Sequence, residues 1–100
     1  GRGNEMYIRG GYNVYPAEVE RVIGGHPNVA DVAVIGHADP VLGEIGVAFV
    51  VPRGDPPSLE ELRAWCCKVL ADYKAPDRLV LLEALPLTSI GKVDKRALHA

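Results

Sequence analysis

The stretch VADVAVIGHADPVLGEIGVAFVV, Val29–Val51, decides the fold of this chain. It contains two runs that are rich in β-branched residues, Val29–Ile35 and Ile45–Val51, and both have apolar residues at odd and at even positions. Such runs are typical of strands that are covered on both faces of a sheet. The sequence therefore predicts two central strands, joined by a loop, GHADPVLGE, that is rich in turn residues.

Helices are predicted on either side of this pair of strands. Pro16 stands where a first helical position is expected, and apolar residues then recur at helical spacing, which predicts a helix over about Pro16–Ile23. Further on, Ser58 followed by Glu61 makes a capping box, the signature of a helix start. The apolar residues after it repeat at intervals of three and four: Leu59, Leu62, Trp65, Cys66, Val69 and Leu70. This spacing predicts a second, longer helix.

Three shorter elements complete the predicted fold. Arg78–Leu82 is expected to form a third strand, and Asp94 can cap a last short helix. Near the start, the alternating piece Met6–Ile8 precedes two glycines and indicates a brief hairpin arm. The predicted class is α+β: a small sheet of about three main strands flanked by helices, with a short N-terminal hairpin arm.

Length and charge exclude several classes of function. The chain has 100 residues and a formal net charge of −2, which allows one modest core and provides no basic field to hold a nucleic acid. No apolar run approaches the roughly 20 residues that cross a bilayer, so we expect no membrane span and a cytoplasmic setting. Residues 74–100, in contrast, carry five basic and three acidic side chains, and this tail is therefore the part suited to anions.

The cysteines and histidines do not indicate a metal site. Cys66 and Cys67 are neighbours within the second predicted helix, where consecutive side chains point about 100° apart, so they can neither bridge the fold nor chelate a metal together. The three histidines have no ligand spacing, and no metal-binding residues are predicted.

Lys92 is the first candidate for chemistry. It lies in the stretch LPLTSIGKVDKRAL, Leu85–Leu98, directly after Gly91, which can adopt backbone angles that let a turn project the next side chain outward. A lysine in such a place can stabilise charge on a carboxylate or a phosphate oxygen. The alternative is a surface lysine beside a helix start.

Two further candidates lie near the start of the chain. Gly10 and Gly11 would let a thin substrate or another backbone pass close by, although a tight turn before the first helix also explains them. Arg2 can form paired hydrogen bonds with hydroxyls or a phosphate, and Asn4 stands beside it; at a chain start such residues are often simply solvated.

Taken together, these places resemble one family. The stretch GRGNEMYIRGGYNVYPAEVE, then LADYKAPDRLVLLEALP with Tyr73-Lys74-Ala75-Pro76, and then LPLTSIGKVDKRAL are similar in content and order to the C-terminal domain of the adenylate-forming superfamily. This superfamily comprises acyl-CoA synthetases, adenylation domains of nonribosomal peptide synthetases, and luciferases. The resemblance implies that residues 1–100 are a mobile lid whose large N-terminal domain is absent, with a hinge segment at residues 1–5.

The resemblance also implies roles for single residues. Lys92 matches the lysine that acts in adenylation, and Arg2 matches the arginine that contacts the ribose of ATP. Gly10 and Gly11 match the loop that lines the pantetheine tunnel. Asn4 matches the hinge position, where the family usually has Asp or Lys; a neutral side chain can still act as a pivot, but it cannot form a salt bridge there.

The expected function follows from the same resemblance. It implies an AMP-forming acid–thiol ligase that converts a carboxylic acid and ATP to an acyl adenylate and then transfers the acyl group to coenzyme A. Magnesium would act through the absent N-terminal domain, the partner of this chain, and the chain alone should have no turnover. Alternatives are the lid of an adenylation domain that loads a carrier protein, and a non-catalytic binding module. Fatty, aromatic and alicyclic acids all remain open as substrates.

Overall fold

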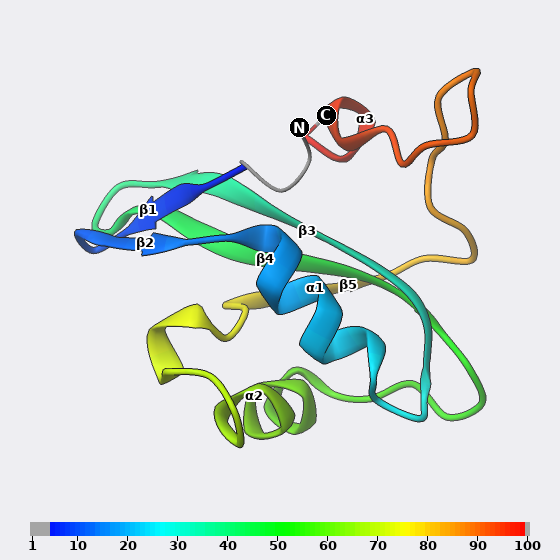
Figure 1. Cartoon of the computed structure of the whole chain (residues 1–100), viewed down its shortest axis with the longest axis horizontal. Coiled ribbons are helices and arrows are strands. Elements are labelled where there is room, and N and C mark those ends of the chain that lie inside the picture. The colour runs from blue at the N-terminus through cyan, green and yellow to red at the C-terminus, as the bar shows by residue number, and fades with distance from the viewer. Residues whose placement is uncertain (1–4, 100) are drawn as a thin grey trace.

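The computed structural model describes residues 5–99, which form a five-stranded sheet with helices on both of its faces (Figure 1). The strands are β1 (Tyr7–Arg9), β2 (Tyr12–Val14), β3 (Val29–Asp39), β4 (Gly43–Pro52) and β5 (Arg78–Leu81). The helices are α1 (Pro16–Gly24), α2 (Leu59–Cys67), the single 3-10 turn η2 (Asp72–Lys74), and α3 (Lys95–Leu98). The predicted α+β class is thus confirmed.

The sheet is built around β4. Strand β3 pairs with β4 along its whole length in antiparallel register. On the other side of β4, β1 pairs antiparallel at Gly43 and β5 pairs parallel from Val47 to Val50. The hairpin arm predicted at Met6–Ile8 is therefore part of the same sheet, through β1. Within residues 5–99, β3 pairs only with β4, so its predicted place as a central strand was wrong.

The connection between β3 and β4 is much shorter than the sequence predicts. Gly36 pairs with Gly46 and Asp39 with Gly43, so most of the stretch predicted as a loop is strand. The turn itself is closed by Asp39, whose carboxylate accepts hydrogen bonds from the backbone N–H groups of Val41 and Leu42. Gly36, the first glycine of that stretch, instead leaves room for the Tyr7 ring, whereas Gly43 begins β4 with φ of +86°.

Both main helices begin as predicted. Pro16 opens α1, and Ser58 and Glu61 form the reciprocal capping box at the start of α2, at 3.1 and 2.8 Å. Helix α2 ends at Cys67, however, one turn before the predicted Leu70. Val69 lies beyond that end with 72% of its surface exposed, so it does not belong to the core as its spacing suggests.

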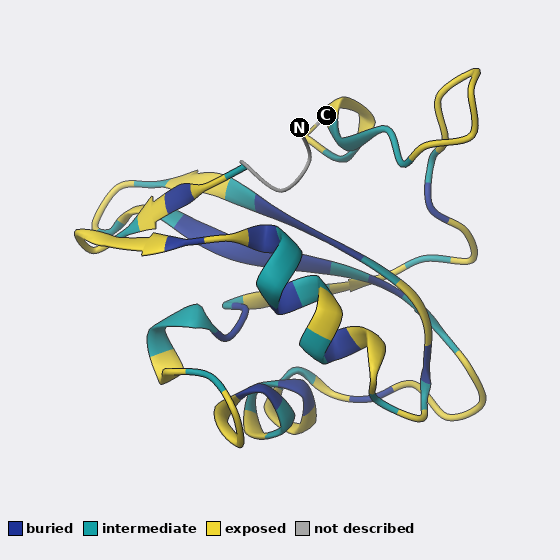
Figure 2. Cartoon of the chain, in the orientation of Figure 1, coloured by how far each residue is buried: buried dark blue, intermediate teal, exposed yellow. Residues whose placement is uncertain are grey.

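One face of the sheet carries the main core. Alternate residues of β3 and β4 pack there against the inner faces of α1 and α2; the fully buried members include Val19, Ile23, Val34, Ala48, Val50, Leu62 and Cys66. Figure 2 shows these buried positions between the sheet and the two helices. The intervening sheet residues Ala33, Ile35, Ile45 and Val47 are also buried, on the opposite face.

That opposite face is the side on which the C-terminal segment runs. After β5 the chain leaves the sheet, forms a hairpin over residues 87–93, and returns as α3 beside β3 (Figure 1). Other segments cover both faces of β3, so its sequence is apolar on both faces. This pattern is typical of a central strand, although β3 lies at the edge of the sheet. In residues 5–99 we find no helix with the length and apolar character needed to cross a membrane.

Candidate functional site

Lys92 lies in a small hairpin that its own backbone holds together. Leu87 and Val93 form an antiparallel bridge, and the Thr88 N–H donates to the Lys92 carbonyl at 2.7 Å. The Gly91 N–H donates to the Thr88 carbonyl at 3.0 Å, and Gly91 has φ of +85°, a value that favours glycine. The predicted glycine turn is present, and Lys92 is exposed beside it.

A hollow of about 850 Å³ lies between this hairpin and the body of the domain. Val32 and Ala33 of β3 line it on one side, and residues 88–90 and 92–96 line it on the other. Lys92 and Arg96 contribute positive charge, whereas Glu5 and Glu20 contribute negative charge. This hollow is the place where the structure brings Lys92 together with both polar and apolar surface.

Helix α3 follows directly after the Lys92 hairpin. The Asp94 carboxylate accepts a long hydrogen bond of 3.4 Å from the Ala97 N–H, so the predicted cap is present. Lys95, the first residue of α3, extends back to the body and contacts Glu5, Glu20 and the Val34 carbonyl. No local sequence pattern indicates this role of Lys95, because its partners are 61 to 90 residues away in the chain.

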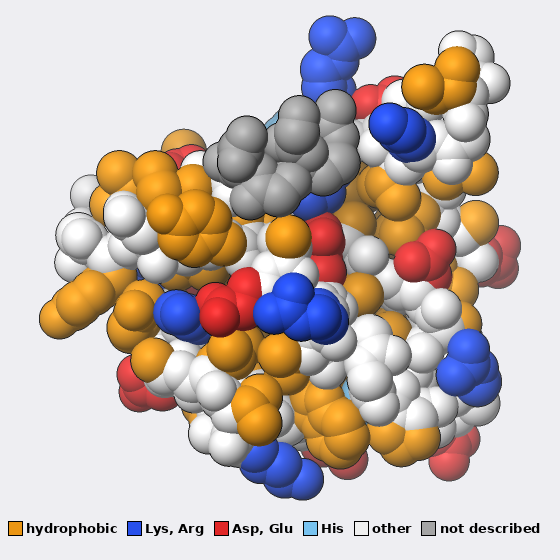
Figure 3. Space-filling view, in the orientation of Figure 1, with side chains coloured by type: hydrophobic (Ala, Val, Ile, Leu, Met, Phe, Trp, Pro, Cys, Tyr) orange, Lys and Arg blue, Asp and Glu red, His pale blue; other side chains and the backbone are white. Residues whose placement is uncertain are grey.

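The second candidate, the Gly10-Gly11 pair, forms the turn of the β1–β2 hairpin. Gly10 and Gly11 have φ of +56° and +88°, the signs that a two-residue type I′ hairpin turn requires. A Cβ atom on Gly10 would lie 3.2 Å from the Leu42 side chain, whereas one on Gly11 would have nothing within 4 Å. Gly11 therefore presents bare backbone to open space. Figure 3 shows hydrophobic side chains gathered over this end of the molecule.

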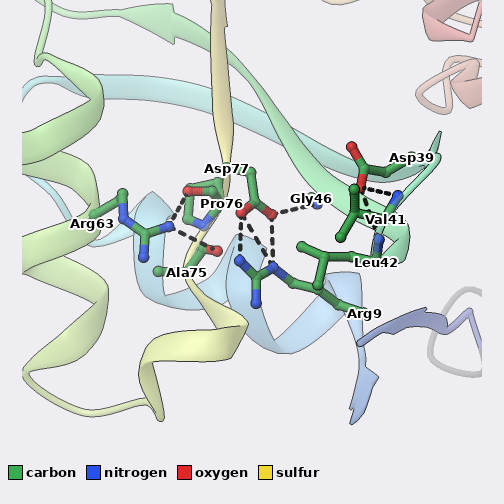
Figure 4. A network of polar contacts seen from close by, with 9 residues as sticks. All are labelled: Arg9, Asp39, Val41, Leu42, Gly46, Arg63, Ala75, Pro76 and Asp77. Atoms are coloured by element: carbon green, nitrogen blue, oxygen red, sulfur yellow. Dashed lines mark hydrogen bonds and ion pairs between the residues drawn. The ribbon is translucent and has the colours of Figure 1, made fainter. Parts of the chain in front are cut away.

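An ion pair fixes this hairpin to the body (Figure 4). Arg9 donates from Nε and Nη2 to the Asp77 carboxylate at 2.8 to 3.2 Å, and the Gly46 N–H donates to the same carboxylate at 3.0 Å. The Asp77 hydrogen bond raises the pKa of the Arg9 guanidinium above its usual value. Asp77 directly follows the Tyr73–Pro76 motif, and its carboxylate holds Arg9, the residue before the glycine turn.

Two further contacts hold the same region. Arg63 of α2 donates to the carbonyl oxygens of Ala75 and Pro76, at 3.4 and 2.6 Å (Figure 4). The ring of Tyr12, next to Gly11, stacks on the ring of Tyr73 with centroids 4.5 Å apart. Sequence reasoning missed Arg9, Arg63 and Asp77 as supporting residues, because no local spacing connects them.

The two candidate turns lie at opposite ends of the molecule. In Figure 1 the β1–β2 turn is at the far left and the hairpin of Lys92 is at the upper right, along a longest dimension of 33 Å. The structure therefore does not bring Lys92 and Gly10-Gly11 into one site. Arg2 and Asn4 lie outside the described residues. No cluster of three or more His, Cys, Asp or Glu side chains that could hold a metal is found within residues 5–99.

Comparisons with known proteins show the family to which the chain belongs. Residues 18–92 match the family model described as the AMP-binding enzyme C-terminal domain. The chain is 44% identical over 98 residues to the long-chain-fatty-acid–CoA ligase FadD13 of Mycobacterium tuberculosis, an alignment that covers 98% of this chain and 20% of that protein. It is 41% identical over 100 residues to the 2,3-dihydroxybenzoate-AMP ligase of Bacillus subtilis, covering 99% of this chain and 19% of that ligase.

A solved structure extends the likeness to three dimensions. The chain matches a fatty acyl CoA synthetase of Mycobacterium tuberculosis with a TM-score of 0.88 and 45% identity, over 94% of this chain and 19% of that one. The fold and its two glycine turns thus define a small domain of the kind found within much longer ligases. The chain belongs to the family of AMP-binding enzyme C-terminal domains. It spans about a fifth of the length of the curated relatives that it matches.

Proposed function

We propose that this chain is the mobile lid of an AMP-forming acid–thiol ligase that makes an acyl-CoA. The observation that supports this proposal is that Lys92 and the Gly10-Gly11 turn are both exposed, are each held by separate contacts, and lie at opposite ends of the molecule. One active site in a partner domain can then receive only one of the two ends at a time. A reaction in two halves, each with its own lid orientation, uses both ends.

In the first half-reaction Lys92 would serve adenylation. Negative charge gathers between the substrate carboxylate and the α-phosphate of ATP as the acyl adenylate forms, and an ammonium group on a four-carbon stem can stabilise it. The hairpin of Lys92 fixes the backbone from which that stem extends, while leaving the side chain exposed. In the same orientation, Arg2 would contact the ribose of ATP.

In the second half-reaction the Gly10-Gly11 turn would line the pantetheine tunnel. Gly11 has no side chain and its missing Cβ faces open space, so a thin pantetheine arm can pass close to the backbone. The Arg9–Asp77 ion pair and the Gly10 N–H bond to the Leu42 carbonyl, at 2.8 Å, keep this turn in place. In both orientations the lid would exclude water from the hydrolysable adenylate.

The parts of the reaction that this chain does not contain would come from the rest of the parent enzyme. Magnesium, which ATP chemistry implies, would be held by the N-terminal adenylation domain. Asn4 would be the pivot between the two domains. Asn4→Pro, which fixes φ, should then impair thioester formation more than adenylation, whereas equal loss of both would count against the pivot.

The decisive experiment uses the parent enzyme with Lys92→Ala. Acid-dependent ATP–pyrophosphate exchange should fall by about 10²–10³-fold, the usual cost of removing one well-placed donor of charge, while supplied acyl adenylate is still converted to thioester. Lys68→Ala is the control, because Lys68 is also an exposed lysine, at the end of α2. Survival of exchange in Lys92→Ala would make Lys92 a surface lysine and would overturn its proposed role in adenylation.

A second candidate is the lid of an enzyme that loads a carrier protein. This second candidate is favoured by the similarity to the 2,3-dihydroxybenzoate-AMP ligase, whose name specifies AMP and not CoA. Offering the parent enzyme either coenzyme A or a pantetheinylated carrier protein separates the two. Faster thioester formation on the carrier protein would replace coenzyme A as the proposed acceptor.

A further inference from the structure

The ammonium group of Lys95 contacts acceptor oxygens of three different residues. Its Nζ atom donates to Glu5 Oε1 at 2.8 Å and to the Val34 carbonyl at 3.0 Å, and it lies 2.8 Å from Glu20 Oε2. Only 18% of the side chain is exposed. Two hydrogen bonds and a close ion pair therefore connect this ammonium group to the body of the domain.

The partners of Lys95 are themselves fixed. Glu20 belongs to α1, and its Oε2 atom also accepts the Val34 N–H of β3 at 2.8 Å. Glu20 and the Val34 backbone therefore form a prearranged acceptor set on the rigid part of the fold. Glu5 is the first described residue of the chain and directly follows Asn4, the proposed pivot. Lys95 thus joins three segments that are far apart in sequence.

The segment that carries Lys92 has little else to hold it. Its hairpin bonds run within residues 86–94, and Leu87 and Ile90 are 60% and 77% exposed. Helix α3 has four residues, too short to be stable without packing. Of the polar contacts between residues 86–99 and the rest of the described chain, those of Lys95 are the ones that reach the sheet and α1. Lys92 stands three residues before it.

From these contacts we infer that Lys95 is a positioning residue for adenylation. By joining the Lys92 segment to Glu5 and Glu20, it sets the distance and direction from the pivot to the reacting lysine. The inference rests on the proposed role of Lys92, because Lys95 acts through Lys92 and does not touch the substrate. It also predicts that residues from Glu5 onward rotate with the lid as one body.

The experiment is a set of variants in the parent enzyme, assayed for both half-reactions. Lys95→Ala should lower the kcat of ATP–pyrophosphate exchange by about 10–100-fold, with KM for ATP changed little, since a misplacement of about 1 Å can cost a factor of that order. Thioester formation from supplied adenylate should stay near the wild-type rate. Lys95→Arg should recover most of the exchange, because a guanidinium can still pair with both carboxylates.

Lys74→Ala is the matched control. It removes an ion pair of similar length and exposure, Lys74–Glu18 at 2.9 Å, that does not involve the Lys92 segment. The rate of ATP–pyrophosphate exchange in Lys74→Ala should be unchanged. Hydrogen exchange of the backbone should become faster over residues 91–99 in Lys95→Ala and not in Lys74→Ala, which gives a readout independent of activity.

A double variant separates positioning from general stability. In the Lys92→Ala background, Lys95→Ala should cause no further loss of exchange, because the residue that it positions is already gone. A further loss there, an equal loss in both half-reactions, or the same loss in Lys74→Ala would overturn the inference. Wild-type exchange in Lys95→Ala beside collapse in Lys92→Ala would overturn it while leaving the proposed function intact.

Discussion

The ring of Tyr7 packs directly against the backbone of Gly36, at a point where a Cβ atom on the glycine would lie 2.5 Å from the Tyr7 Cβ. Gly36 pairs across the β3–β4 ladder with Gly46, which has Tyr7 as its nearest neighbour too. Two facing glycines thus make a slot in the sheet for one aromatic ring. This slot seats β1, and with it the Gly10-Gly11 turn, on the body of the domain.

The first prediction concerns this slot. Gly36→Ala should lower the free energy of unfolding by about 1–3 kcal/mol, because the added methyl group overpacks the contact with a buried ring and adjacent backbone. Gly24→Ala at the end of α1 is the control; its Cβ would meet nothing closer than 3.9 Å, and its stability should be unchanged or slightly higher. Urea unfolding of the 100-residue chain measures both, and equal midpoints would refute the overpacking.

The second prediction concerns the Tyr7 hydroxyl. It is buried and, within residues 5–99, has no hydrogen-bond partner. Burial, and next the nearby Asp77 charge, raise the Tyr7 pKa far above its ordinary value of 10.0. Above about pH 10 the unfolded chain releases this proton while the folded chain retains it, so stability should fall as pH rises, by up to about 1.4 kcal/mol per pH unit.

Tyr7→Phe tests this directly. In this variant the free energy of unfolding should fall less steeply as the pH rises above about 10. At pH 7 the variant should be as stable as the wild type or more stable by up to about 1 kcal/mol, since an unpaired buried hydroxyl is removed. Tyr12→Phe, at an exposed ring, should keep the slope. Unfolding measured between pH 7 and pH 11 gives the comparison; an unchanged slope in Tyr7→Phe would assign it to other groups.

The third prediction links Asp77 to the thioester-forming half-reaction. Asp77→Ala should cost about 1–3 kcal/mol of stability, because it leaves the Arg9 guanidinium and the Gly46 N–H without their shared acceptor. In the parent enzyme it should slow thioester formation from supplied adenylate more than ATP–pyrophosphate exchange, the reverse of the Lys95→Ala pattern. An equal effect on both rates would contradict a selective role in supporting the glycine turn.

The fourth prediction concerns the neighbouring cysteines. Burial raises the pKa of the Cys66 thiol to about 11, whereas Cys67 is exposed. Because the thiolate is the reactive form, a disulfide reagent at pH 8 should modify one thiol per native chain and two in denaturant. Cys67→Ser should leave none reactive in the native state. Rapid reaction of both thiols would show that α2 opens readily from the sheet.

Local signals predicted most of the elements. Pro16 marked the start of α1, because proline lacks the N–H group that would have no partner in the first turn. The Ser58–Glu61 box marked the start of α2, because these two side chains accept hydrogen bonds from backbone N–H groups there. Apolar runs located β3, β4 and β5. One error occurred where a distant contact overrides the local preference, because Gly36 lies in a strand on which Tyr7 packs. The other occurred at the end of a helix, because α2 ends before Val69 and leaves it exposed.

By itself the sequence determined the α+β class, the family resemblance, and the two glycine turns with Lys92 beside one of them. It could do so because capping, periodicity and turn chemistry act between residues a few positions apart. Only the tertiary structure decided that the hairpin arm joins the sheet, that Asp77 holds Arg9, and that Lys95 holds Glu5 and Glu20. Those pairs are 68 to 90 residues apart, and an ion pair leaves no periodic trace in a sequence; it exists only once the chain has packed.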